Sequence, residues 1–314
     1  MKCPLCGRSE TRTLFQAMDR LYRTTEQIFQ VVECAGCGLI RLDPWPTLDE
    51  LRRYYPDEYW FAPHADAASR LEETYRRFVL RDHLRFVLRA AEDGPEKGLL
   101  LDVGCGGGLL LRLLQERGLR VAGLETSEAA AAAAWEHNRV RVLCADLAQA
   151  PLAPGSCSVL TMFHVVEHLP DAVSYLESAR QLLAPDGRLI IQVPNASSWQ
   201  FLLFGSSWNG VDVPRHLVNY RERDLERLLE KCGFEIVRRK HFSLRDNPAG
   251  VVSSLAPGLD PMARRVRRAR ESAAGKLAKD LLYFALVVAA LPFTLLEAAC
   301  GAGSTIMVEA RKKA

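Results

Sequence analysis

Short apolar runs alternate with stretches of helical periodicity along the middle and the end of the chain. Such runs predict buried strands, and the periodic stretches between them predict connecting helices. The expected strands are 99–103, 120–124, 140–144, 158–163, 188–193, 234–242 and 304–310. The expected helices lie near 108–117, 127–137, 171–184 and 222–232, with a turn at Asp186-Gly187 before the fifth strand. Strands alternating with helices are typical of βαβ units, so the pattern predicts an α/β fold with a doubly wound parallel sheet.

The remaining segments have other patterns. Residues 70–91 carry apolar positions at roughly helical spacing, which predicts one connecting helix. The start of the chain is punctuated by cysteines, and a basic stretch followed by an apolar one precedes the last strand. The expected organisation is a small module at 1–61, a linking helical segment at 62–97, the core at 98–245, a helical insertion at 246–303, and the last strand with a basic tail at 304–314.

Composition narrows the class of protein. With 48% hydrophobic and 25% charged residues over 314 positions, the chain is globular and neither disordered nor fibrous. The net charge of +3 gives no overall electrostatic drive toward nucleic acid. The nine cysteines are an odd number, and the start lacks the apolar stretch of a signal peptide. Both features predict a reducing, cytoplasmic location.

A glycine-rich turn follows the first strand of the core. It reads Asp102-Val-Gly104-Cys-Gly106-Gly-Gly108, and glycines there allow a tight turn and a close approach of the backbone to a ligand. Glu125 closes the next strand, at the spacing from which an acidic residue reaches ribose hydroxyls. The glycine spacing is not that of dinucleotide-binding proteins, and the Asp102 carboxylate would repel a pyrophosphate. The turn therefore suits a ligand that carries an ammonium group.

With three further motifs, this turn resembles the class I S-adenosylmethionine-dependent methyltransferases. The motifs are Gly-Leu-Glu-Thr-Ser at 123–127, Ala-Asp-Leu at 145–147, and Leu-Leu-Ala-Pro-Asp-Gly-Arg-Leu-Ile-Ile at 182–191. The resemblance covers about residues 98–243 and implies a seven-stranded, Rossmann-like methyltransferase sheet with S-adenosylmethionine as cofactor.

The resemblance also implies roles for individual residues. The glycine turn would wrap the methionine portion of the cofactor, with Asp102 near its amino group. Glu125 would hold the ribose hydroxyls, Asp146 would face the adenine amino group, and Leu147 would pack near the ring. Asp146 has an alternative as a helix N-cap, because aspartate is a favoured cap residue. The sulfonium methyl is already activated, so the enzyme mainly has to hold a nucleophile in line and exclude water.

The substrate side is expected beyond the fourth strand, where His164, Glu167 and His168 follow. Their spacing would place them on one face of a helical turn. Some related methyltransferases of quinone biosynthesis use a similar pattern for a divalent metal, so a metal site is one alternative. The other is that Glu167 shapes the pocket and caps a helix, while His168 contacts the substrate.

A loop after the fifth strand carries further candidates. The methyltransferases that this chain resembles have Pro-Arg-His at this place, and such a loop lies over the acceptor. His216 is a candidate base, because histidine titrates near neutrality. Alternatively, His216 anchors the loop by hydrogen bonds. Trp208 is either a wall for a sugar or aromatic ring, or a core residue.

Two C-x-x-C pairs, Cys3 with Cys6 and Cys34 with Cys37, predict a tetrahedral structural zinc with four thiolates. The sequence from Cys34 to Tyr59 resembles the amino-terminal segment of bacterial methyltransferases of sugar and polysaccharide biosynthesis. An RNA methyltransferase with a zinc finger is the rival hypothesis. It predicts a basic module, whereas residues 1–61 have eight basic and nine acidic residues.

The insertion before the last strand combines charge with apolar sequence. Sixteen uncharged residues, Leu281 to Leu296, include Pro292 and follow five arginines: Arg264, Arg265, Arg267, Arg268 and Arg270. A spanning helix needs about 20 apolar residues. Three alternatives stay open: a helix packed on the enzyme or on a second subunit of a homodimer, a helix lying on an anionic membrane through 262–299, and a true span.

Together these features predict a methyltransferase acting on a small or lipid-linked acceptor such as a sugar, with a histidine as base. It would be cytoplasmic or peripheral to the inner face of the membrane. The alternatives are the RNA methyltransferase and a non-catalytic, cofactor-binding scaffold at the membrane.

Overall fold

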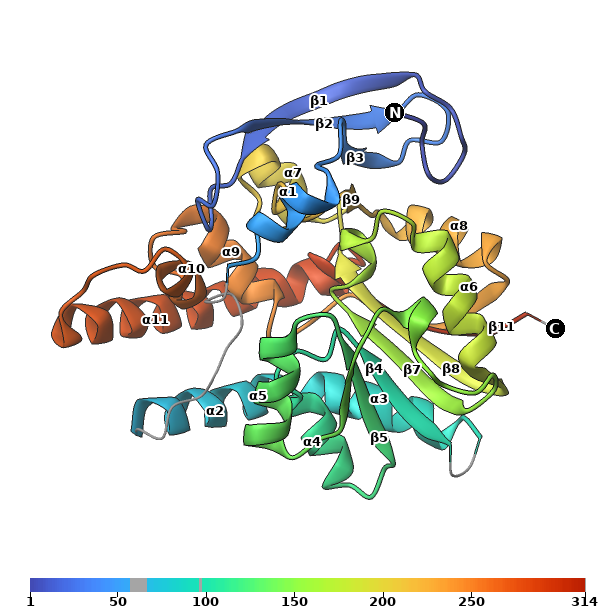
Figure 1. Cartoon of the computed structure of the whole chain (residues 1–314). Helices are drawn as coiled ribbons and strands as arrows, with labels where there is room; N and C mark the ends of the chain where they lie inside the picture. The colour runs from blue at the N-terminus through green and yellow to red at the C-terminus, as the bar shows by residue number, and fades with distance from the viewer. Residues whose placement is uncertain (57–66, 96–97, 314) are drawn as a thin grey trace. The chain divides into compact units, whose positions relative to one another are not determined.

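A computed structural model of the chain describes residues 1–56, 67–95 and 98–313 (Figure 1). The chain forms two compact units, each assembled from segments that are not consecutive in sequence. The first unit comprises residues 1–59, 194–225 and 246–306, and the second comprises residues 60–193, 226–245 and 307–314. The amino-terminal module thus shares a unit with the whole of the insertion, 246–303.

The seven-stranded sheet confirms the predicted α/β class. Its order is β10-β11-β8-β7-β4-β5-β6. The strands are β4 (Leu99–Val103), β5 (Val121–Glu125), β6 (Val142–Cys144), β7 (Cys157–Phe163), β8 (Leu183–Pro194), β10 (Phe234–Lys240) and β11 (Thr305–Lys312). Strands β4 to β8 pair in parallel, and β10 pairs antiparallel with β11. The first strand of this sheet along the chain is β4, and later strands are added on both sides of it, so the sheet is doubly wound.

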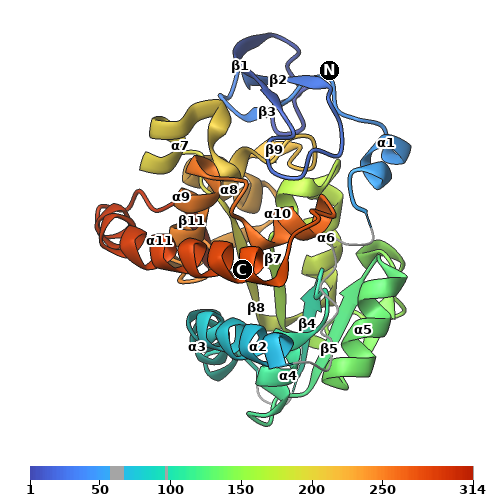
Figure 2. The same ribbon diagram turned by 90° about the vertical axis from the view of Figure 1, so that its left-hand side faces the viewer.

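Helices follow the strands as the periodicity predicts: α4 (Leu109–Gln115), α5 (Glu128–Asn138), α6 (Ala172–Leu182) and α8 (Glu222–Lys231). Two further helices, α2 (Ala67–Val79) and α3 (Arg81–Glu92), precede β4. In Figure 2, α3 lies to the left of strands β7 and β8, and α6 lies to their right.

Two local predictions are wrong. The single helix expected over 70–91 is two helices, and the break at Leu80 coincides with burial of that side chain in the core. The turn expected at Asp186-Gly187 lies inside β8, which already starts at Leu183. Leu183 pairs with Cys157 and Arg188 with Val159, so the extra residues form an irregularity in the strand while both ends stay paired.

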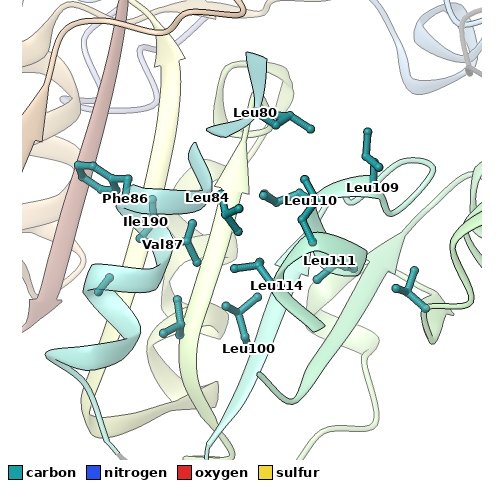
Figure 3. Close-up of a cluster of buried hydrophobic side chains, with 14 of the residues drawn as sticks. Leu80, Leu84, Phe86, Val87, Leu100, Leu109, Leu110, Leu111, Leu114 and Ile190 are labelled. Carbon is teal, nitrogen blue, oxygen red and sulfur yellow. The ribbon is translucent and has the colours of Figure 1, made fainter. Parts of the chain in front are cut away.

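An apolar cluster holds the second unit together (Figure 3). Leu111 and Leu114 of α4 are fully buried beside Val87 of α3, and Leu100 and Ile190 contribute from the sheet. The leucine run at the start of α4 therefore serves packing, and it fixes this helix directly behind the glycine turn.

The first unit has its own antiparallel sheet, in the order β1-β2-β3-β9. The strands are β1 (Thr11–Met18), β2 (Ile28–Cys34), β3 (Ile40–Leu42) and β9 (Val218–Asn219). The helices of this unit are α1 (Leu48–Arg53), α7 (Trp199–Phe204), α9 (Asn247–Leu255), α10 (Pro261–Val266) and α11 (Ala273–Ala299). The sequence predicts none of these four strands, and β9, with two residues, is too short to show a periodicity.

Candidate functional site

The glycine turn leaves the carboxyl end of β4, between β5 and β7. Parallel pairing places Asp102 opposite Gly123 of β5 and Thr161 of β7. Gly104 and Gly108 have φ of +70° and +72°, and a Cβ there would lie 2.7 and 2.4 Å from valine side chains. A Cβ on Gly106 would meet nothing within 4 Å. The turn thus requires glycine at both ends and opens toward free space at its middle.

Asp102 is a buried carboxylic acid at the base of this turn. Its side chain is 5% exposed, and Thr161 Oγ1 donates to Asp102 Oδ1 over 2.6 Å. Burial raises the pKa of Asp102 to about 7, and the negative charge of Glu125 adds to the increase, whereas Thr161 and the more distant Arg245 oppose it.

Glu125 is the second buried carboxylate of the site. One of its oxygens accepts from the Gly106 amide over 3.0 Å, and the other accepts from the amides of Thr126 and Ser127 over 2.8 and 3.0 Å. Within the described residues, neither Glu125 nor Asp102 forms an ion pair with a lysine or arginine. The carboxyl edge of the sheet therefore presents negative charge with no cation of the protein directly against it.

The third strand leads to Asp146 and Leu147. Asp146 accepts from the Ala148 amide over 3.0 Å and caps a one-turn helix, as the N-cap alternative predicts. Leu147 is 2% exposed. Tyr175 of α6 lies against this turn, and burial raises its pKa to about 12, with a further contribution from the charge of Asp146. Sequence reasoning missed Tyr175, because it sits in an ordinary helix and belongs to no motif.

The segment after β7 is not a regular helical turn. His164 has a φ of +56°, and a short 3-10 helix follows at 166–168. His164 Nδ1 lies 3.2 Å from Glu167 Oε1, and His164 Nε2 lies 2.8 Å from Gln192 Nε2. Both ring nitrogens thus make contacts inside the protein, and His164 meets Glu167 as the spacing predicts. The ligand atoms of Glu167 and His168 also lie within 4.8 Å of each other, and the metal alternative for this segment stays a prediction.

Arg215 organises the loop that carries His216 in the first unit. Its guanidinium is fully buried, donates to Asp19 Oδ1 over 2.8 Å and to Asp212 Oδ1 over 2.7 Å, and lies 4.4 Å from the Tyr22 ring centroid. Although burial opposes ionisation of Asp19, hydrogen bonds and charge from Arg215 lower the pKa of that carboxyl below its ordinary value. The amino-terminal module and the loop are therefore joined by a buried ion-pair network.

His216 is held by the same loop. Its Nδ1 lies 2.9 Å from the Gly210 carbonyl oxygen, and the residue is 7% exposed. A carbonyl only accepts, so Nδ1 carries a proton, and Nε2 lies 3.8 Å from Asp212 Oδ2. The hydrogen bond to the Gly210 carbonyl is of the kind expected if His216 anchors the loop, which is the second of its two alternative roles. The other candidate, His168, belongs to the second unit.

Trp208 is a core residue of the loop. It is 4% exposed, and its ring packs edge-on against Phe201 with centroids 5.5 Å apart. A Cβ on Gly210 would lie 2.4 Å from the Trp208 ring, so glycine is required there for the indole to fit. This burial gives no support to the alternative that Trp208 forms a wall for a sugar ring.

The four cysteines of the amino-terminal module converge. All four Sγ atoms lie within 4.8 Å of one another, with Cys3 to Cys37 at 3.6 Å and Cys6 to Cys34 at 3.5 Å. Zinc bonded to sulfur at about 2.3 Å would separate tetrahedral ligands by roughly 3.8 Å. The donor set therefore fits a structural zinc. Burial of Cys34 is outweighed by hydrogen bonds from backbone amides and neighbouring thiols, which lower its pKa to about 7.

Comparison with known proteins identifies the family. Residues 75–239, just over half of the chain, match the family described as "Methyltransferase domain". The chain belongs to this family, and its sheet is that of the class I S-adenosylmethionine-dependent methyltransferases. A crystal structure of such a methyltransferase from Archaeoglobus fulgidus shares the fold, with a TM-score of 0.51, 19% identity, and coverage of 79% of this chain and 100% of that chain.

Curated relatives match the same region. A ubiquinone biosynthesis O-methyltransferase of Pseudomonas paraeruginosa is 30% identical over 131 residues, which are 39% of this chain and 56% of the relative. A probable S-adenosylmethionine-dependent methyltransferase of Mycolicibacterium smegmatis is 30% identical over 184 residues, which are 57% of this chain and 61% of the relative. The chain thus spans somewhat more than half the length of these relatives.

The buried network around Arg215 predicts a large loss of stability in Asp19→Asn. The change leaves a buried guanidinium with one carboxylate, which should lower the free energy of unfolding by about 3 kcal/mol in urea denaturation at pH 7. Because the pKa of Asp19 is depressed in the folded state, this contribution is present above its ordinary pKa and is lost as pH falls through the folded value. The matched control is Asp49→Asn, whose ion pair with Arg52 is exposed. Equal stability of the two variants would contradict the role of the network.

Proposed function

We propose that this protein transfers the methyl group of S-adenosylmethionine to an oxygen of a small or lipid-linked acceptor such as a sugar. The single observation that carries the proposal is the pair of buried carboxylates, Asp102 and Glu125, at a glycine turn where no lysine or arginine of the described residues lies directly against them. Buried negative charge of this kind favours a cationic ligand and disfavours a diphosphate. The family membership of residues 75–239 supports the same cofactor.

The residues around the turn fit the cofactor. Asp102 would hold its amino group, Gly104, Gly106 and Gly108 would leave room for its methionine portion, and Glu125 would accept from its ribose hydroxyls. Asp146 and Leu147 would border the adenine. When bound, S-adenosylmethionine supplies an electrophilic methyl group on sulfur. The chain's own contribution is to orient this donor and to exclude water.

A hydroxyl acceptor benefits from a base, and His216 suits this role best. The bond of its Nδ1 to the Gly210 carbonyl fixes the ring and leaves the lone pair on Nε2. His168 is the second candidate. The O-methyltransferases of ubiquinone biosynthesis among the relatives favour a small oxygen acceptor over RNA, as does the near balance of charge in the amino-terminal module.

We further propose that Cys3, Cys6, Cys34 and Cys37 hold a structural zinc. Four thiolates fill a tetrahedral coordination sphere, so this metal would take no part in methyl transfer. Its role would be to fix the two cysteine turns. The second of them joins β2 to β3, and β3 pairs with β9, which follows the His216 loop.

Methyl transfer is tested with labelled S-adenosylmethionine and fractionated small molecules, lipids and RNA. Label should enter the small-molecule or lipid fraction, and His216→Gln should lower kcat about 100-fold or more, because a base contributes roughly that factor. Label in RNA alone would overturn the acceptor class in favour of the RNA methyltransferase. Label in no fraction would favour the cofactor-binding scaffold.

Cofactor affinity should depend on the ionisation of Asp102. Its pKa is raised to about 7, so the carboxyl is neutral at lower pH and attracts an ammonium group less. Calorimetry should show affinity for S-adenosylmethionine rising from pH 6 to pH 8. Asp102→Asn should remove this rise and weaken binding at least about tenfold at pH 8. Asp186→Asn, at an exposed aspartate, is the control. Undiminished affinity of Asp102→Asn for S-adenosylmethionine would refute the proposal that Asp102 holds the amino group.

Metal analysis of the purified protein should find one zinc per chain. Cys6→Ser should lose the metal and lower the Tm by about 10 °C or more, since binding of structural zinc contributes directly to folding. Cys300→Ser, at an exposed cysteine outside the cluster, should change neither quantity. Retention of zinc and Tm by Cys6→Ser would disprove the site.

A further inference from the structure

Over residues 280–297, helix α11 carries its polar side chains on the side that faces the protein. Thr294 and Glu297 are fully buried on this side, together with Val287. Glu297 accepts from the Gln200 amide over 2.9 Å and from Gln200 Nε2 over 3.0 Å. Burial raises the pKa of Glu297. Glu297 is therefore fixed against α7, whereas the Thr294 hydroxyl donates to the Leu291 carbonyl of its own helix.

The first half of α11 shows the same arrangement. The Tyr283 hydroxyl lies 3.2 Å from Ser253 Oγ and 3.5 Å from an Asp260 oxygen, next to α9, against which α11 packs. One turn earlier, Asp280 forms an ion pair with Arg264 of α10. Polar and ionic contacts thus join α11 to its own unit along most of its length.

The outward side of the same helix is apolar. Eight large apolar residues are between 38% and 60% exposed: Leu277, Leu281, Leu282, Phe284, Leu286, Val288, Leu295 and Leu296. At 100° per residue these positions cover an arc of about 200°. The usual amphipathic arrangement of a surface helix is inverted here, because the apolar arc faces outward and the polar stripe faces inward.

Such a face is expected to be covered. Soluble monomers rarely expose a continuous apolar patch of this extent, and its exposure to water is unfavourable. Two packed helices bury a seam of two positions per heptad. A seam through Leu281, Phe284 and Val288 would leave Leu282, Leu286 and Leu296 exposed. The breadth of the arc fits a surface that receives the whole side of a helix.

The charges beside the arc indicate which surface this is. Residues 264–280 contain seven lysines and arginines and two acidic residues. Arg264 is buried in ion pairs with Glu271 and Asp280, so this arginine does not belong to the exposed basic residues. Arg268 and Arg270 are exposed shortly before the helix begins. An apolar face next to exposed basic residues is typical of helices that bind anionic bilayers.

We propose that the outward face of α11 docks on the surface of an anionic phospholipid bilayer, with the helix lying in the plane of the membrane. By length and composition, α11 could also cross a bilayer. Its uncharged part, residues 281–296, is about 24 Å long, however, against a hydrocarbon core of about 30 Å. A crossing helix would also lose the contacts of Tyr283 and Glu297. The docking goes beyond the proposed methyl transfer and does not depend on it.

The proposal is tested by sedimentation of the full chain with two kinds of vesicle, one of phosphatidylcholine alone and one an equimolar mixture with phosphatidylglycerol. The test variant combines Leu281→Gln, Phe284→Gln and Val288→Gln. The matched control combines Ile28→Gln, Leu48→Gln and Val237→Gln, whose side chains are similarly exposed in other elements. Circular dichroism should show equal Tm for both variants, because all six side chains face outward.

Wild type and control should bind the mixed vesicles, at least about tenfold more tightly than phosphatidylcholine alone. The test variant should bind on the order of 100-fold more weakly, because three large apolar side chains no longer enter the bilayer. Equal binding by test variant and control, or equal binding to both vesicles, would overturn the proposal. The proposal would also be overturned if the wild type were a dimer that does not bind vesicles and the test variant were a monomer. A second copy of the chain would then cover the face.

Discussion

The parallel pairing of β4 with β5 on one side and β7 on the other is the constraint on which the cofactor site depends. Because these strands run in the same direction, their carboxyl ends meet at one edge of the sheet. Asp102, the glycine turn and Glu125 come together there although 23 positions separate the two acidic residues. The hydrogen bond from Gly106 to Glu125 joins the first loop to the second strand, so the turn and the carboxylate form one structure.

The acidic groups around Arg215 and those at the glycine turn are buried in opposite ways. In the first unit, Asp19 and Asp212 face the guanidinium of Arg215, which compensates the desolvation of all three groups. In the second unit, Asp102 has Thr161 as its close partner, and the neighbouring charge is the like charge of Glu125. The first arrangement is complete without a ligand and serves structure. The second is satisfied when a cation is added, which is why it indicates function.

The same reasoning distinguishes α11 from an ordinary surface helix. A fold normally buries apolar side chains and leaves polar ones in water. Glu297 and Thr294 are buried while Leu281 and Phe284 are exposed, so this helix turns an apolar face outward, which supports the docking proposed above. An anionic bilayer would suit this face and the basic residues before it, and would bring the protein to lipid-linked acceptors.

Local signals in the sequence were sufficient for the strands of the α/β core, the glycine turn with Glu125, and the two cysteine pairs. Each depends on residues within one or two elements: a strand on its own apolar run, the turn on the conformational freedom of glycine, a cysteine turn on its spacing. The tertiary structure alone decided the addition of β9 to the amino-terminal sheet, the placement of Tyr175, and the partners of Arg215. It also decided which side of α11 faces outward. These features join segments up to about 200 positions apart, and no periodicity within a segment records which distant segment will pack against it.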